Sequence, residues 1–161
     1  MSDAPTTHRS QAEQARIEAE VIEMIEERTP WQKAMGVRVE RLLPELVLRL
    51  DWRPEFAGHP LLPRMHGAVV ASVLDILGGA CFMMAIAQKH PAEDFDQVMQ
   101  RALRVATIDL RVDFLRAATG SSFLARSEIT RLGGRVGSAQ MRLHDDEDRL
   151  VATACGSYVV S

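Results

Sequence analysis

The spacing of apolar residues near the start of the chain predicts an amphipathic helix. Ser10 to Glu13 has the pattern of a capping box, and Ile17, Val21 and Ile25 then recur at every fourth position. Apolar residues spaced in this way lie on one face of a helix. We therefore expect a helix over residues 10–28 with one face buried.

Six stretches further along the chain alternate apolar and polar residues with the period of a β-strand. They span residues 37–43, 46–52, 105–115, 122–132, 135–144 and 150–160. In the third stretch, apolar side chains are expected on one face and polar ones on the other: Ala106, Ile108, Leu110, Val112 and Phe114 against Thr107, Asp109, Arg111 and Asp113. Turn residues separate the later stretches, so we predict that the last four strands run consecutively antiparallel.

One segment shows neither pattern. In the 24 residues from Met65 to Gln88, Asp75 is the only acid or base apart from His66. A run of this length can span a bilayer, but an acid near its middle costs roughly 2.5–3.5 kcal/mol on insertion scales. Arg64 and Lys89 at its two ends show no charge asymmetry. We therefore predict a helix that is buried inside the protein.

These elements fit an α+β architecture in which a curved antiparallel β-sheet wraps around one long central apolar helix. An α+β sandwich of unspecified topology is the alternative, and the wrapped helix is preferred because only one segment is apolar throughout. We expect a disordered N-terminus at 1–9 and a single domain at 10–161, in which a core at 36–161 follows the N-terminal helix. The polar stretch 89–101 is interpreted as a connection, with a lid as the alternative.

Composition and charge narrow the class of protein. Lys and Arg number 19 against 22 Asp and Glu, for a formal charge of -3, which argues against partners such as nucleic acid or a membrane surface. Residues 1–10 contain no apolar run, so no signal peptide is indicated and a cytoplasmic protein is expected. Cys81 and Cys155 have no metal-ligand spacing around them, and both are expected to be buried free thiols.

The candidate chemistry begins where the apolar helix starts, at His66-Gly67-Ala68. The first amides of a helix have no intrahelical acceptor and carry the positive end of its dipole. The amides of Gly67 and Ala68 are therefore expected to face outward as a site for a carbonyl oxygen or an oxyanion, with His66 as a polar ring beside them. A helix start with a satisfied histidine is the alternative.

Asp75 is the second candidate, because a carboxylate in so apolar a helix suits a general base or a nucleophile. A buried acid satisfied by a structural hydrogen bond is the alternative. Asp75 lies eight residues beyond Gly67, roughly 12 Å along a helix at 1.5 Å per residue, so one chain does not bring both to one small substrate. If two such helices lie antiparallel across a dimer, Asp75 of one faces the Gly67 amide of the other.

Gly133 and Gly134 are interpreted as a hairpin turn, because a nucleotide-binding loop would need a following Lys-Ser/Thr or a strand-turn-helix context. Arg135 beside this turn and Arg116 at the end of the strongest strand are candidates for holding phosphates. Solvated surface arginines are the alternative for both.

Together these residues resemble the hotdog-fold acyl-CoA thioesterases of the phenylacetate-pathway (PaaI-like) group. The likeness covers roughly residues 36–160. It rests on the His66-Gly67-Ala68 helix start, Asp75 at the family spacing, the strand from Thr107 to Arg116, the Gly134-Arg135 turn and the final strand from Leu150 to Val159. It implies a hotdog fold and hydrolysis of an acyl-CoA or aryl-acyl-CoA by a homodimer or a dimer of dimers, with no metal or bound organic cofactor.

The resemblance also implies roles for individual residues. The Gly67 amide would polarise the thioester carbonyl, His66 would shape that pocket, and Asp75 of the partner subunit would activate water or attack directly. Further substrate contacts are implied at His59, Ala68, Phe82, Met83, Arg116, Gly133, Gly134 and Arg135.

Three positions depart from the family pattern. Ala68 replaces a second glycine, His59 stands near the place of an Asn or Gln, and Gly79 replaces a hydroxyl residue that some relatives have one turn after the acid. Because of these departures, the sequence does not predict the identity of the acyl group. Two alternative functions remain: a non-catalytic acyl-CoA-binding protein and a hotdog enoyl-CoA hydratase or dehydratase.

Overall fold

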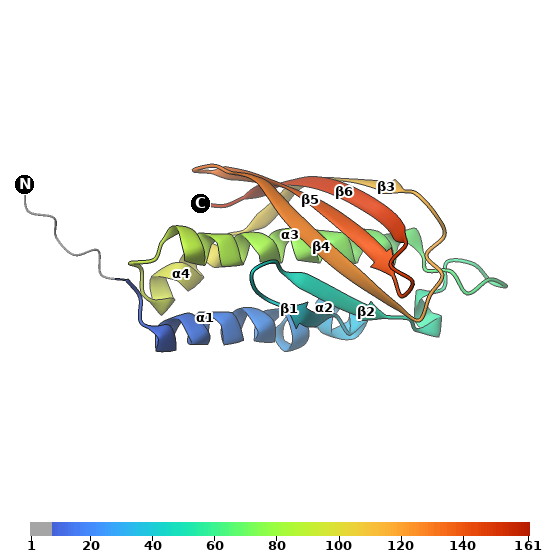
Figure 1. Ribbon diagram of the computed structural model, residues 1–161, viewed down its shortest axis with the longest axis horizontal. Helices are drawn as coiled ribbons and strands as arrows, with labels where there is room; N and C mark the ends of the chain where they lie inside the picture. The colour runs from blue at the N-terminus through green and yellow to red at the C-terminus, as the bar shows by residue number, and fades with distance from the viewer. Residues whose placement is uncertain (1–7) are drawn as a thin grey trace, which may run out of the picture.

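The computed structural model describes residues 8–161. One long helix, α3 (Gly67–Lys89), lies along the concave side of a curved β-sheet, and helix α1 (Gln11–Glu23) lies on the other side of α3 (Figure 1). The predicted wrapped-helix α+β architecture is confirmed.

Six strands form one antiparallel sheet in the order β1-β2-β4-β5-β6-β3. Their bounds are β1 Arg38–Arg41, β2 Val47–Asp51, β3 Ala106–Phe114, β4 Ser122–Leu132, β5 Val136–Asp145 and β6 Leu150–Val159. The predicted consecutive pairing is right for β4, β5 and β6 but wrong for β3, which pairs with β6. Because β2 already pairs with the free side of β4, β3 lies at the far edge of the sheet.

The N-terminal helix forms with the predicted cap. The Ser10 hydroxyl accepts a hydrogen bond from the Glu13 amide at 3.2 Å, and the Glu13 carboxylate accepts one from the Ser10 amide at 3.3 Å. Ile17, Val21 and Ile25 are all buried, as the four-residue spacing predicts.

Beyond α1 the helix continues differently from the prediction. It passes into a π-helix, η1 (Met24–Arg28), and a short helix that was not predicted, α2 (Pro30–Met35), follows. Residues 1–7 of the predicted disordered segment lie outside the described residues. Arg9, by contrast, donates a hydrogen bond to the Glu93 carbonyl at 2.8 Å.

Burial inside the protein accounts for the apolar character of α3. The helix is long and apolar enough to cross a membrane, but 61% of its most apolar window is buried. Val73, Leu74, Leu77 and Phe82 are fully buried against the sheet and the neighbouring helices. A helix this apolar is stabilised when other elements cover most of its surface.

The segment after α3 is anchored in the core by a short helix. Helix α4 (Phe95–Ala102) buries Val98, Met99 and Ala102 in the core. The Arg101 guanidinium donates to both carboxylate oxygens of Glu93 at 2.9 to 3.0 Å, which closes the loop before the helix.

The two cysteines have different environments. Cys81 on α3 is buried, as predicted, whereas Cys155 on β6 is exposed. The prediction was wrong for Cys155 because successive residues of a strand face opposite sides: positions 154 and 156 face the core, so the Cys155 side chain points to the outer face.

Candidate functional site

The start of α3 offers one free amide rather than the two that were expected. His66 is the N-cap, and its ring Nδ1 accepts a hydrogen bond from the Ala68 amide at 3.0 Å. Within residues 8–161, the Gly67 amide donates to no acceptor. The Gly67 N–H is therefore the group that remains available to a ligand, and it carries the positive end of the helix dipole.

A cavity of about 430 Å³ surrounds this amide, and we refer to it as the Gly67 cavity. Its lining comes from the loop before α3, the start of α3 and the end of β3: Gly58, Arg64, Met65, His66, Gly67, Val70, Phe114, Leu115, Arg116, Ala117, Ala118 and Val151. The Phe114 ring lies 3.3 Å from the position that a Cβ on Gly67 would take. Arg116 was predicted as a phosphate contact together with Arg135, and the structure places it here with Arg64, which was not among the predicted residues.

Asp75 lines a different cavity, of about 360 Å³, which we refer to as the Asp75 chamber. It lies between α3, the N-terminal helices and the start of β3, and its lining is mostly apolar: Met24, Ile25, Thr29, Trp31, Gln32, Asp75, Ile76, Gly79, Ala80, Met83, Leu103, Val105 and Thr107. Within one chain, the free amide and the carboxylate thus belong to separate cavities.

One oxygen of the Asp75 carboxylate is held by two hydroxyl groups. The Thr107 hydroxyl donates to Oδ1 at 2.8 Å, and the Tyr158 hydroxyl donates to the same oxygen at 3.5 Å. Burial, followed by the nearby charge of Asp75, raises the pKa of Tyr158, so this hydroxyl keeps its proton. Oδ2 has no hydrogen-bond partner among residues 8–161, which leaves it free to face a substrate or a water.

The alternation of apolar and polar residues predicted Thr107 on the polar face of β3, and this prediction is wrong. Thr107 pairs with Tyr158 and Asp109 pairs with Ser157, so Ile108 is an extra residue that forms a β-bulge. The bulge changes the phase of the strand and turns Thr107 toward Asp75. No signal in the sequence marks this bulge, and the hydroxyl beside the acid was therefore missed.

Gly78 and Gly79 are adjacent in α3, but packing explains the presence of a glycine at only one of the two positions. A Cβ on Gly78 would lie 2.0 Å from the Tyr158 hydroxyl oxygen, so Tyr158 requires a glycine there. A Cβ on Gly79 would meet nothing within 4 Å among the described residues. Glycine inside a helix costs about 0.5–1 kcal/mol relative to alanine. Packing therefore explains Gly78 but not Gly79.

The structure brings only some of the predicted substrate contacts to these cavities. Met83 lines the Asp75 chamber. Phe82 is fully buried, with its ring centroid 5.3 Å from that of Tyr158, and it reaches neither cavity. The His59 ring accepts hydrogen bonds from the amides of Leu61 and Leu62 at 3.1 and 3.2 Å, which stabilises its own loop.

The Gly133–Arg135 turn lies at the opposite end of α3 from Arg116. The Lys89 ammonium donates to the Gly133 carbonyl at 3.0 Å, and Lys89 is the last residue of the helix. The helix has 23 residues, so this turn lies roughly 33 Å along its axis from Gly67 at 1.5 Å per residue. One chain does not place Arg116 and Arg135 in a common phosphate site.

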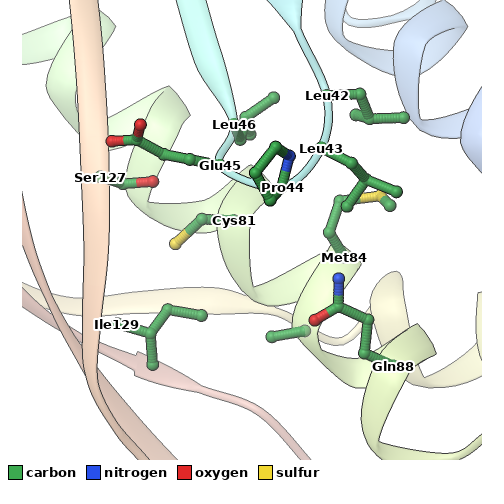
Figure 2. A pocket seen from close by; sticks show the side chains of 11 residues that line it. Leu42, Leu43, Pro44, Glu45, Leu46, Cys81, Met84, Gln88, Ser127 and Ile129 are labelled. Carbon is green, nitrogen blue, oxygen red and sulfur yellow. The ribbon is translucent and has the colours of Figure 1, made fainter.

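A third cavity, of about 200 Å³, lies on the opposite side of α3, between the β1–β2 turn and β4 (Figure 2). Cys81 and Met84 of α3 line it together with Pro44 and Ile129. Burial raises the pKa of the Cys81 thiol to about 12, which keeps it protonated and unreactive near neutral pH. Among residues 8–161, no group of three or more His, Cys, Asp or Glu is placed to hold a metal ion.

Comparisons with known proteins agree on one family. A family model described as the thioesterase superfamily matches residues 62–152. The medium/long-chain acyl-CoA thioesterase YigI of Escherichia coli is 34% identical over 139 residues, which cover 86% of this chain and 90% of the relative. Its counterpart in Salmonella typhimurium is 33% identical over the same shares. The crystal structure of a Shewanella oneidensis protein related to the thioesterase superfamily has a TM-score of 0.89 and 28% identity, covering 94% of this chain and 100% of that one.

Proposed function

The chain belongs to the thioesterase superfamily and is a thioester hydrolase, and on this premise we propose that its substrates are acyl-CoA thioesters, cleaved between two subunits. In this proposal the Gly67 amide of one subunit polarises the thioester carbonyl. Asp75 of the other subunit acts as a general base or as a nucleophile. The name of the Escherichia coli relative supports an acyl-CoA of medium or long chain length.

The separation of the two cavities carries the two-subunit part of the proposal. The Gly67 cavity holds the free amide, and Asp75 lies in the other chamber. The two residues are roughly 12 Å apart along the helix axis, which exceeds the reach of a single carbonyl group. A second copy of the chain would complete each half-site.

Strand β3 supports a particular arrangement of that second copy. It is one of the two edge strands of the sheet, and it leaves large apolar side chains exposed: Ile108 is 54% exposed and Phe114 is 58% exposed. Exposed apolar edge strands are usually covered or paired in folded proteins. A symmetric homodimer in which two β3 strands pair would cover this edge.

Pairing of this kind would also bring the two half-sites together. Thr107, near one end of β3, bonds to Asp75, and Phe114, at the other end, lies beside Gly67. If two β3 strands pair antiparallel about an axis near their middle, Thr107 of one lies close to Phe114 of the other. Asp75 of each subunit then faces Gly67 of its partner.

The reaction itself needs few groups. With Asp75 as a base, Oδ2 takes a proton from a water whose oxygen attacks the thioester carbonyl carbon. The developing oxyanion is stabilised by the Gly67 amide, the C–S bond breaks, and the coenzyme A thiolate leaves and takes up a proton. With Asp75 as a nucleophile, its oxygen attacks the same carbon and water cleaves the resulting anhydride. The Thr107 hydroxyl orients the carboxylate in both cases.

The cavities also suggest where the two parts of the substrate bind. Arg64 and Arg116 at the Gly67 cavity suit the phosphates of coenzyme A. The apolar Asp75 chamber suits the acyl group. No cofactor has a role in this scheme.

The decisive experiment is a panel of acyl-CoA and aryl-acyl-CoA substrates assayed by release of free coenzyme A, with and without a metal chelator. Release that the chelator does not affect would support the proposal. Tight acyl-CoA binding in calorimetry without thiol release would identify an acyl-CoA-binding protein instead. Hydration of an enoyl-CoA without thiol release would identify a hydratase.

A further inference from the structure

Gly79 lies on the wall of the Asp75 chamber, where packing does not require a glycine. Nothing within the described residues comes closer than 4 Å to its missing Cβ. Along α3, Gly79 is one turn after Asp75 and one turn before Met83, and all three residues line the chamber. The absent side chain therefore leaves the chamber open between the acid and Met83.

The N-terminal helices and the segment between α4 and β3 form the facing wall. Met24 and Ile25 come from the π-helix η1, a rare conformation that occurs often at functional sites. Leu103 and Val105 come from the segment before β3. Trp31 is 58% exposed and Leu103 is 65% exposed, so both lie at the rim.

Most of the residues that line the chamber are apolar, and Asp75, Thr107, Thr29 and Gln32 are its polar members. Its extent along α3 matches the length of an alkyl chain. Asp75 and Met83 are roughly 12 Å apart along the helix. An extended alkyl chain with C–C bonds of about 1.5 Å advances about 1.25 Å per carbon, so roughly ten carbons fit this length.

We infer that Gly79 is a specificity-determining residue, whose missing side chain lets an unbranched acyl chain of about ten carbons extend from Asp75 past the π-helical wall to Met83. The inference rests on the proposed function and deepens it by naming the acyl class and the place where its length is selected. A larger side chain at position 79 closes the chamber one turn beyond Asp75, roughly 6 Å, and leaves room for about four or five carbons.

The experiment compares the wild-type protein with Gly79→Ala and Gly79→Leu on straight-chain acyl-CoAs from butyryl to palmitoyl. Gly79→Leu is expected to lower kcat/KM for chains of ten or more carbons on the order of 10–200-fold, the range for a mismatch of hydrophobic size. The butyryl substrate should change by less than about threefold. Gly79→Ala should shift the profile in the same direction by a smaller factor.

Ala85→Leu provides the matched control. It adds the same side chain to α3 but in the third cavity, on the opposite side of the helix. It is expected to leave the chain-length profile unchanged. Should Gly79→Leu fail to fold, Gly79→Ala decides the question, because alanine favours the helix.

Two results would overturn the inference while leaving the thioesterase function intact: an equal loss at every chain length in Gly79→Leu, or no loss at all. If the wild-type protein releases no coenzyme A from any substrate, the proposed function fails. Calorimetry then tests the chamber alone with the same acyl-CoAs. Selective loss of long-chain binding in Gly79→Leu would support the inference, and unchanged binding would contradict it.

Discussion

The two cavities along α3 differ in the chemical groups that line them. The Gly67 cavity offers two arginines and an amide that has no acceptor among residues 8–161, and no acid is among its lining residues. The Asp75 chamber offers a carboxylate held by a threonine, and neither Lys nor Arg is among its lining residues. In the proposed mechanism, the first cavity binds negative or developing negative charge, and the second provides the base or nucleophile beside a mostly apolar space. Because neither cavity holds both groups, the proposed mechanism requires two subunits to assemble.

The largest expected effect is the loss of the carboxylate. Asp75→Asn keeps the size of the side chain and its bond to Thr107 but removes the base or nucleophile. We expect kcat/KM to fall about 10²–10⁴-fold, measured by coenzyme A release. Asp51→Asn, on the exposed end of β2, is the control and should retain full activity. An active Asp75→Asn variant with an unchanged melting temperature would remove Asp75 from the mechanism.

The Gly67 cavity can be tested through its amide alone. Proline is well tolerated at the first position of a helix, so Gly67→Pro removes the N–H proposed to bind the carbonyl and keeps the helix start, while it adds ring atoms beside Phe114. We expect a loss of about 10²–10³-fold in kcat with the fold retained. Gly67→Ala keeps the N–H and adds a Cβ that the Phe114 ring can accommodate by a small shift, so its loss should be much smaller. Equal losses in the two variants would point to crowding rather than to the amide.

Mixing the two inactive variants tests whether the half-sites come from different subunits. A heterodimer of Asp75→Asn and Gly67→Pro contains one site with both native groups and one site with neither. After unfolding and refolding an equal mixture, about a quarter of wild-type activity should return, because half of the dimers are mixed and each has one intact site. Size-exclusion chromatography with light scattering reports the assembly. A dimer that recovers nothing would place both groups of each site in one chain.

The third cavity on α3 contains a thiol that we expect to be unreactive in the folded protein. At pH 8 the Cys81 thiol should stay protonated, because burial raises its pKa to about 12. Labelling with a thiol reagent should therefore modify Cys155 rapidly and Cys81 only after unfolding in urea. Mass spectrometry of tryptic peptides checks which cysteine is modified. Rapid labelling of Cys81 in the folded protein would show that this cavity opens to solvent.

Local patterns in the sequence were sufficient for the six strands and for helices α1 and α3, and they singled out two candidate site residues. The bounds of β4 agree with the prediction at both ends, and α3 ends at Lys89, one residue beyond the apolar run Met65 to Gln88. Asp75 and Gly67 stood out because one acid in an apolar helix and a glycine at a helix start are local features. Phe82 was assigned to the substrate groove for its type, whereas the packing of Tyr158 above Gly78 buries it. Membership of the PaaI-like group stays a prediction.

The sequence by itself determined that one apolar helix must be wrapped by an antiparallel sheet, and that a glycine and an acid lie about two turns apart on it. Periodicity carries this information because burial repeats with the geometry of each element. Tertiary structure alone decided that β3 lies at the edge beside β6, that a bulge at Ile108 turns Thr107 to Asp75, and that His66 occupies the Ala68 amide. These three features depend on contacts between residues far apart in the chain or on a single hydrogen bond. Neither kind of interaction produces a periodic pattern of apolar residues in the sequence.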